Sequence, residues 1–405
     1  MATTSFLYHA LGLQGYRLLR TEYRGGRLAY HIERAAGKRA CAACGAHASR
    51  LKLDGRFERE FLGLPVGFKA QVIILHGHLQ ACSHCGARLR EPIPFADGKS
   101  RCLRALGRFI VDLCGMTTIK QVAEHLKVSW DFVKDVFKAH LKQRHKHRRV
   151  SQVRYLAVDE FATHKGHKYM TTAMDLETGE ILHAQEGKDA GALIPFLQKL
   201  KKAGIQPKAV AMDMSEAYAN AVREVFGAAV DIVHDPFHVV ALASEAIDET
   251  RRDLARALKG EDRKVIKGTR FLLLKAKENL APEALTRLTQ LMAANEPLYK
   301  AYLLKEELRH FWRLPDEEAG KAFLDQWTAD ARALGNKHFA KLANTLDAHR
   351  PGLLAYFAHR ISTARLEGTN NKIKVLKRQA YGFRDMEFFK LRLYFLHERS
   401  IQMPG

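Results

Sequence analysis

Residues 154–164 read RYLAVDEFATH, a short apolar run that ends in two adjacent acids, Asp159 and Glu160. The next segments predict two strands joined by a turn (168–185), an amphipathic helix (190–204), a buried strand that ends at Asp213 (208–214), a helix (215–227) and a last strand (228–235). Three leading antiparallel strands followed by parallel strand–helix units are typical of the ribonuclease H-like sheet. The stretch therefore predicts an α/β core of this kind.

In such a sheet Asp159 lies on the first strand and Asp213 at the end of the fourth, beside it in space. Two carboxylates about 4 Å apart repel by roughly 4 kcal/mol at an effective dielectric constant of about 20, so the pair needs a cation. Oxygen ligands alone favour Mg²⁺ or Mn²⁺, the ions used for in-line displacement at phosphorus. The alternative for each residue taken singly is an ordinary turn aspartate at a strand end.

Composition narrows the class of protein. The chain has 405 residues, 47% of them apolar, which is enough for a full core and for two or three domains of about 150 residues. Its 66 Lys and Arg against 44 Asp and Glu give a net charge of +22, so nucleic acid is the expected partner and a merely basic or ribosome-associated protein the alternative. No apolar run approaches the roughly 18 residues of a membrane span, and the N-terminus lacks the features of a signal peptide. We expect a cytoplasmic protein without a membrane partner.

Four of the six cysteines form two C-x-x-C pairs, Cys41 with Cys44 and Cys82 with Cys85, and each pair is followed by glycine. In a cytosolic chain such pairs indicate a tetrahedral thiolate site for structural Zn²⁺. Between the pairs, residues 51–65 and 68–80 alternate apolar and polar residues as strands do, which predicts a zinc ribbon. A redox pair or unrelated buried thiols are the alternatives.

Residues 117–141 predict a helix-turn-helix, with Ser129 as N-cap of the second helix. On that helix Trp130, Lys134 and Lys138 are the candidates for major-groove contacts, together with Ser129 at its start. The run 138–149 contains no acid and is interpreted as a basic linker that binds phosphates, including through Arg148 and Arg149. An ordinary helical hairpin is the alternative for the motif.

Helical patterns then continue for more than a hundred residues and favour an all-α insertion before a final basic helix. That helix carries a single acid, Glu367, in RISTARLEGTNNKIKVLKRQ (360–379). The expected organisation is a zinc-ribbon DNA-binding domain (1–98), a helix-turn-helix with basic linker (99–150), the first part of the core (151–240), the insertion (241–358) and the last part of the core with the Glu367 helix (359–405).

Taken together, the ribbon, the helix-turn-helix, AVDEF, AMDMSEAY, HDPFHV (234–239) and RLEGTNNKIKVLKRQAYGFRD (365–385) resemble bacterial insertion-sequence transposases of the ISL-three family. The resemblance covers essentially the whole chain. It implies a nucleoid-associated DDE-type enzyme with a catalytic triad at Asp159, Asp213 and Glu367, which transfers phosphoryl groups without a covalent intermediate. Asp159 would bridge two Mg²⁺ or Mn²⁺ ions, Asp213 would bind one and Glu367 the other.

The implied DNA partners are the element's terminal repeats and the target, held by at least a homodimer because two ends must be joined. The candidates on the Glu367 helix are Asn370, Asn371 and Lys374 for the scissile strand, and Lys372, Lys377 and Arg378 for the DNA backbone. His238 is a candidate neighbour of the metals or a core or capping histidine. Trp312 is a candidate for base stacking or a core residue. A transcriptional regulator and a structure-specific nuclease are the rival functions.

Overall fold

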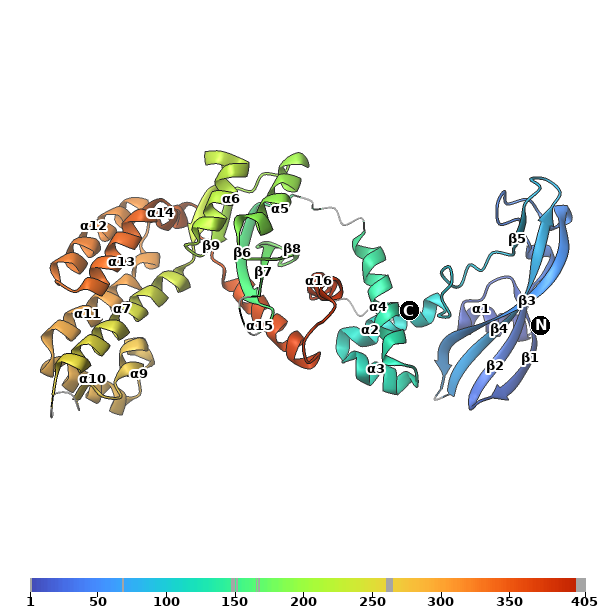
Figure 1. Cartoon of the computed structure of the whole chain (residues 1–405), viewed down its shortest axis with the longest axis horizontal. Helices are drawn as coiled ribbons and strands as arrows, with labels where there is room; N and C mark the ends of the chain where they lie inside the picture. Colours follow the sequence, from blue (N-terminus) through green and yellow to red (C-terminus); the bar gives the residue numbers. More distant parts are fainter. Residues whose placement is uncertain are drawn as a thin grey trace. The chain divides into compact units, whose positions relative to one another are not determined.

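The computed structural model describes residues 2–67, 69–146, 150, 152–164, 166, 168–259 and 265–397. Contacts divide the chain into two units: residues 1–148 together with 387–405, and residues 149–386 (Figure 1). Among the described residues, no helix combines the length and the apolar character that a membrane crossing needs. Arg148 and Arg149, the predicted phosphate contacts of the basic run, lie outside the described residues.

The first unit begins with a five-stranded sheet in the order β1-β2-β4-β3, with β5 paired to β4. Strands β3 and β4 contain the two alternating segments and form a long antiparallel hairpin, of 16 and 14 residues. Ile73, Ile74 and Leu75 of β4 are fully buried, and β4 lies between β2 and β3 in the sheet. The elements are α1 (Ala2–Leu11), β1 (Tyr16–Arg24), β2 (Arg27–Arg34), β3 (Leu51–Val66), β4 (Lys69–Cys82) and β5 (Arg88–Arg90), with short 3-10 turns at Ala36–Lys38 and Ala48–Arg50.

Four helices complete this unit: α2 (Arg104–Met116), α3 (Ile119–Leu126), α4 (Trp130–His145) and α16 (Met386–Phe395). A three-residue turn joins α3 to α4, and Lys127 adopts the left-handed conformation in it (φ 52°). The Ser129 hydroxyl accepts a hydrogen bond from the Phe132 amide at 3.2 Å, which confirms Ser129 as the N-cap. The helix pair has the connection expected of a helix-turn-helix.

Two features of this unit differ from the expectation. Residues 138–145 are the last turns of α4 and not a linker, because an acid from far along the chain neutralises them: Glu387 of α16 pairs with Lys138 at 2.9 Å and Lys142 at 2.8 Å. Helix α16 belongs to this unit, whereas the sequence grouped it with the core. The ring of Phe137 contacts Phe388 and Phe395, which lie more than 250 positions away in sequence, so no local pattern indicates the contact.

The second unit contains a five-stranded sheet in the order β10-β9-β6-β7-β8. Strands β6, β7 and β8 pair antiparallel, and β9 and β10 continue the sheet parallel to β6. The order and directions confirm the predicted succession, including the strand of Asp159 beside the strand that precedes Asp213. The elements are β6 (Tyr155–Ala162), β7 (Tyr169–Asp175), β8 (Ile181–Glu186), α5 (Ala190–Lys202), β9 (Ala209–Met212), α6 (Glu216–Phe226), β10 (Asp231–His234) and α15 (Ala364–Gln379).

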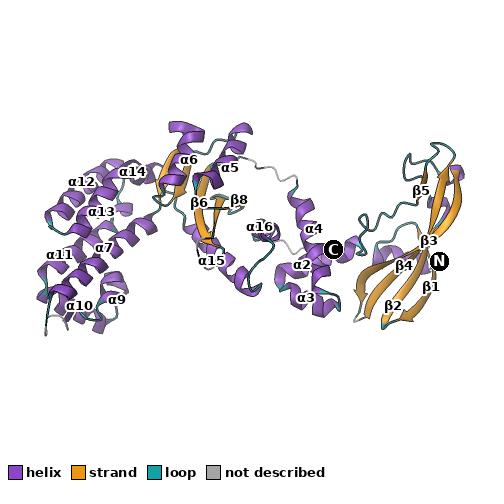
Figure 2. Cartoon of the chain, in the orientation of Figure 1, coloured by secondary structure: helices purple, strands orange, loops and turns teal. Residues whose placement is uncertain are grey.

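Helices α5 and α6 pack on this sheet through a core that includes Leu156, Leu197 and Val222. Between β10 and α15 the described residues form only helices, turns and loops (Figure 2), as the sequence predicted. Their separate core includes Trp327, whose indole N–H donates to the Leu304 carbonyl. The helices are α7 (Pro236–Ala257), α9 (Arg270–Leu274), α10 (Pro282–Ala294), α11 (Glu296–Leu308), α12 (Glu317–Ala333), α13 (Lys337–Ala348) and α14 (Arg350–His359), with 3-10 turns at Gly227–Ala229, Lys277–Asn279 and Phe311–Arg313.

Candidate functional site

The four cysteines of the two C-x-x-C pairs meet in the first unit, with all four sulfur atoms within 4.8 Å of one another. The Sγ atoms of Cys41 and Cys85 are 3.7 Å apart, and those of Cys44 and Cys82 are 3.8 Å apart. Sulfurs about 2.3 Å from a central tetrahedral ion lie about 3.8 Å from one another, whereas a disulfide needs about 2.05 Å. The donor set therefore fits Zn²⁺.

Each pair uses the same backbone turn. The Gly45 amide donates to the Cys41 carbonyl and the Gly86 amide to the Cys82 carbonyl, at 3.0 and 2.9 Å. Both glycines have positive φ, 75° and 72°, which a residue with a side chain would adopt only with strain. The turns also aim amides at sulfur: the Cys44 and Ala43 backbone N–H groups hold the pKa of Cys41 at about 6. This thiol is poised as a thiolate ligand.

In the second unit, Asp159 and Asp213 lie on neighbouring parallel strands, since β6 pairs with β9 up to Ala157 and Ala211. Burial, with the nearby charges of Glu160 and Asp213, raises the pKa of Asp159 from 3.8 to about 6. Burial and the charge of Asp213 also raise the pKa of Glu160. A cluster of half-buried acids whose charges repel is the electrostatic character of a cation site.

The two adjacent acids of the first strand have different partners. Asp159 accepts the Glu160 amide on one oxygen at 2.8 Å and the Asn370 side-chain amide on the other at 2.7 Å. A hydrogen bond between the Glu160 side chain and Tyr218 acts on the pKa of Glu160, and the Tyr218 hydroxyl bonds in turn to Thr171. Asp159 is thus held toward α15 and Glu160 toward α6.

Helix α15 carries Glu367 and is fixed to the sheet along its length. Asp235, which caps α7, also accepts the Thr363 amide at 2.8 Å just before α15. Arg365 donates to the carbonyls of residues 176–178 in the turn after β7, and Lys377 donates to the Ala162 carbonyl at the end of β6. The 16-residue helix, about 24 Å long at 1.5 Å per residue, is therefore fixed to the sheet near both of its ends.

Glu367 is exposed, and its side chain has no hydrogen bond or ion pair within the described residues. Because residues three apart on a helix are neighbours, it lies next to Asn370, whose side chain reaches Asp159. The carboxylates of Asp159, Asp213 and Glu367 are nonetheless not gathered within 4.8 Å, since among the described residues only the cysteines form such a group. Asp159 and Asp213 lie on adjacent strands, and Glu367 lies on α15, one helical turn before the residue that contacts Asp159.

A buried histidine, His234, contacts the backbone of Asp213. The ring of His234 contacts the Asp213 carbonyl through Nδ1 at 3.2 Å and His349 through Nε2 at 3.2 Å. Burial, with the charge of His349, lowers the pKa of His234 to about 4, so the ring is neutral near pH 7. A Cβ at Gly352 would come within 2.4 Å of this ring, so only glycine fits there. The insertion thereby contributes to the position of Asp213.

The metal-site candidates fit a hard cation. The charge of His238, in the first turn of α7, acts on Asp159 and Glu160, so this residue lies near the acids. Asn370 is 5% exposed, and its amide oxygen is buried without a hydrogen-bond partner in the described part of the chain, at a cost of about 1–3 kcal/mol. Carboxylate and amide oxygens are the ligands that Mg²⁺ and Mn²⁺ prefer.

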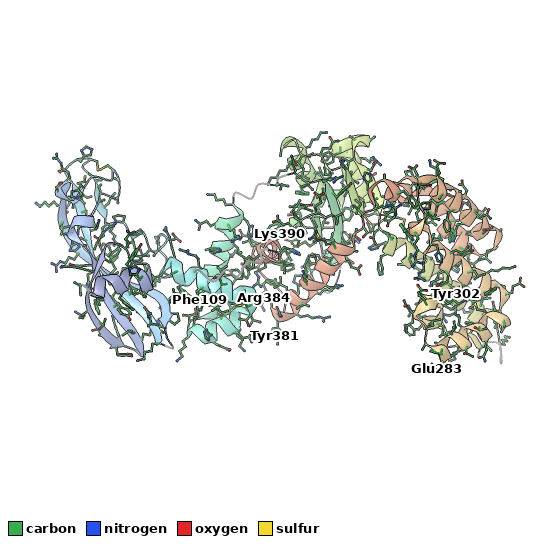
Figure 3. All side chains as sticks on the ribbon, turned by 180° about the vertical axis from the view of Figure 1, so that it is seen from behind. Phe109, Glu283, Tyr302, Tyr381, Arg384 and Lys390 are labelled. Atoms are coloured by element: carbon green, nitrogen blue, oxygen red, sulfur yellow. The ribbon has the colours of Figure 1, made fainter. Side chains whose placement is uncertain are left out.

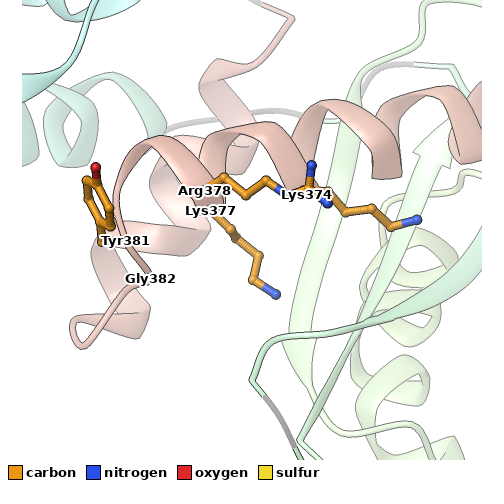
Figure 4. Close-up of a pocket in the computed structure, with 5 residues that line it drawn as sticks. All are labelled: Lys374, Lys377, Arg378, Tyr381 and Gly382. Carbon is orange, nitrogen blue, oxygen red and sulfur yellow. The ribbon is translucent and has the colours of Figure 1, made fainter.

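Beyond Asn370, α15 presents a cationic hollow lined by Lys374, Lys377, Arg378, Tyr381 and Gly382 (Figure 4). None of its three cations forms an ion pair within the described residues, and burial lowers the pKa of Lys377. Tyr381 is 100% exposed, with a left-handed backbone (φ 51°), at the end of the helix (Figure 3). Asn371 and Lys372 are exposed on the same helix. This surface has the composition of a nucleic-acid contact.

The remaining candidates differ in their surroundings. Trp130 is 47% exposed at the start of α4, and the Lys134 ammonium lies 5.6 Å from its ring centroid. Lys138 is directed to Glu387, so helix α16 occupies the side of α4 from which it extends. Trp312 packs edge-on against Phe311 in the core of the insertion, which is the core alternative left open by the sequence.

Four residues that the sequence did not indicate hold together the helices and strands of the candidate site. Asp235 joins the starts of α7 and α15, and Arg365 fixes α15 to the turn after β7. His234 and Tyr218 support the two acidic strands. The segment HDPFHV (234–239) contributed to the family resemblance. Its Asp235 accepts a hydrogen bond from the Thr363 amide, which lies 128 positions away, so the sequence did not indicate this contact.

The chain is similar to known proteins over most of its length. Residues 156–393 match the family model for ISL3-type DDE transposases, described as "Transposase". The "Transposase for insertion sequence element IS1001" of Bordetella parapertussis is 32% identical over 389 residues, which cover 94% of this chain and 95% of the relative. The "Transposase for insertion sequence element IS1557" of Mycobacterium tuberculosis is 32% identical over 282 residues, 64% of this chain and 63% of the relative.

Among solved structures, the chain aligns with the "Drosophila P element transposase strand transfer complex", with a TM-score of 0.37 and 10% identity over 73% of this chain and 92% of that one.

Proposed function

Because this chain belongs to the ISL3 (ISL-three) family of insertion-sequence transposases, we propose that it binds the terminal repeats of its own element and catalyses metal-dependent strand cleavage and strand transfer. The observation that carries the proposal is the placement of Asp159 and Asp213 on adjacent strands, where burial, with the charges of Glu160 and Asp213, raises the pKa of Asp159 to about 6. We also propose that the sheet is a ribonuclease H-like core, which its strand order supports.

Mg²⁺ or Mn²⁺, bound as a pair, would supply an activated oxygen nucleophile and stabilise the leaving oxygen of an in-line displacement. Asp159 would hold both ions, because it lies on the central strand, which pairs with β9 on one side and contacts α15 through Asn370. Asp213 and Glu367 would each hold one. The Asn370 bond and the Glu160 amide orient Asp159 for that role.

DNA would follow α15 away from the acids. Lys374 lies about 10 Å from Glu367 along the helix axis and Arg378 about 16 Å, at 1.5 Å per residue. At about 3.4 Å per base pair, these residues would meet phosphates three to five pairs from the scissile bond. Lys372, Lys374, Lys377 and Arg378 would neutralise the backbone, and Tyr381 would stack on a base or sugar.

The first unit would supply end recognition. The structural zinc would fix the loops at the open end of the β3–β4 hairpin, where β3 begins and β4 ends, while Ser129, Trp130 and Lys134 at the start of α4 would face the major groove. Arg148 and Arg149 would contact phosphates. Because two ends are cut and joined together, we propose a homodimer on DNA.

The test uses duplexes that contain the DNA flanking the coding sequence on each side, with Mg²⁺ and a target plasmid. Joined products are expected. Cleavage without joining would indicate a nuclease, and metal-independent binding alone a regulator; either result would overturn the proposal.

A further inference from the structure

Asn370 lies at a buried position on α15, whereas a residue that binds DNA phosphates needs an exposed one. Its side chain is 95% buried, whereas the next residue, Asn371, is exposed and accepts a hydrogen bond from Lys374. The Asn370 amide nitrogen donates to Asp159 at 2.7 Å across a sequence separation of 211 residues. It is the contact that joins the middle of the Glu367 helix to the acid on the central strand.

The orientation of the Asn370 amide follows from this contact. Turning the amide by 180° would bring its oxygen against a carboxylate oxygen, so the nitrogen faces Asp159. The nitrogen and oxygen atoms of a side-chain amide are about 2.2 Å apart, so the Asn370 oxygen lies at most about 5 Å from the Asp159 oxygen that accepts the hydrogen bond. This amide oxygen is buried without a partner in the described part of the molecule. A buried acceptor beside a cluster of acids is suited to a cation.

We propose that Asn370 is a member of the metal site: its N–H group orients Asp159, and its amide oxygen ligates the same cation. The inference rests on the proposed function and deepens it, because it assigns to Asn370 a role toward the metal in place of a contact with DNA. Both ends of one amide are then used, and the hydrogen bond also keeps Glu367, three residues earlier, within reach of the cation.

The probe is Mn²⁺ alone, added to the full chain without DNA, with the affinity measured by titration of the free-ion paramagnetic resonance signal. The expected result is that Asn370→Ala binds Mn²⁺ at least about tenfold more weakly than the unmodified chain, as loss of a metal-site residue commonly does. Asn370→Asp keeps an oxygen ligand and adds charge, so it binds Mn²⁺ within about threefold of the unmodified chain or more tightly.

Asn371→Ala is the matched control, because it removes the same side chain from the exposed neighbouring position and leaves Mn²⁺ affinity unchanged. Thermal unfolding in EDTA distinguishes a purely structural role of Asn370 from a role in metal binding. A purely structural role would lower the melting temperature of Asn370→Ala without a change in Mn²⁺ affinity. That result would overturn the inference, as would equally weak binding by the Ala and Asp variants. If Asn370→Ala fails to fold, the Asp variant decides, and weakened Mn²⁺ binding by it counts against the inference.

Failure of this inference is distinguishable from failure of the proposed function. If the unmodified chain joins element ends while Asn370→Ala binds Mn²⁺ normally, only the role of Asn370 is wrong. If the unmodified chain neither cuts nor joins those ends, the proposed function is wrong.

Discussion

Asp159→Asn should stabilise the ion-free protein near neutral pH. Burial raises the pKa of Asp159 from 3.8 to about 6, and a rise of about two units costs about 3 kcal/mol at roughly 1.4 kcal/mol per unit once the group is ionised. The variant removes this cost, but its single amide oxygen replaces two acceptor oxygens; when it keeps the bond from Asn370, the Glu160 N–H loses its acceptor, a loss of about 1 kcal/mol. The expected net gain is about 2 kcal/mol at pH 7.5.

The sign of the effect depends on pH. The pKa in the folded protein lies above that in the unfolded chain, so the cost is absent below about pH 4, grows between about pH 4 and pH 6 and is constant above that range. At pH 4 the variant should therefore gain nothing from the charge and be slightly less stable. Saturating Mg²⁺ at pH 7.5 should stabilise the unmodified chain and reduce the difference, because the ion requires the ionised carboxylate.

The assay is urea unfolding in EDTA, followed by tryptophan fluorescence in a Trp130→Phe background. The two remaining tryptophans, Trp312 and Trp327, then both report on the second unit. Glu367→Gln is the control, because this exposed acid without a partner in the described residues should change the free energy of unfolding by less than about 0.5 kcal/mol. No gain for Asp159→Asn at pH 7.5, or an equal gain at pH 4, would refute the reasoning.

Three further perturbations separate the parts of the molecule. Cys41→Ser should lose bound zinc and weaken binding to element ends, while Cys102→Ala should retain one zinc equivalent by metal analysis; unchanged affinity with one equivalent in the first variant would contradict the zinc assignment. Phe388→Ala should destabilise the first unit by about 3 kcal/mol in a Trp130 fluorescence transition, and an unshifted transition would exclude α16 from that unit. Asp235→Ala should slow end cleavage at least about tenfold with end binding intact, and normal cleavage would mean that α15 needs no anchor at its start.

The sheet was predictable because its information is local. Strand alternation and the helix period are written in consecutive residues, so 154–235 indicated both the elements and their order. The cysteine cluster was predictable for the same reason, since each pair forms its own turn and only one ion geometry suits two such pairs.

The connections of the site were not predictable, because they depend on contacts between distant residues. Nothing near Asn370 indicates that it reaches Asp159 and not a phosphate. The basic end of α4 suggested a linker because Glu387, its neutralising partner, follows more than 240 positions later. Contacts between distant residues determine both the partner of Asn370 and the helical conformation of the basic end of α4. No short sequence pattern indicates such contacts.

Glu367→Gln tests the central claim most directly, through single-turnover cleavage of labelled element-end DNA in Mg²⁺. The exposed side chain has no structural partner among the described residues, so fold and end binding should be unchanged while cleavage falls by about a thousandfold or more. Cleavage at the rate of the unmodified chain, in a variant that binds the end equally well, would contradict the assignment of Asp159, Asp213 and Glu367 as one metal-dependent active site.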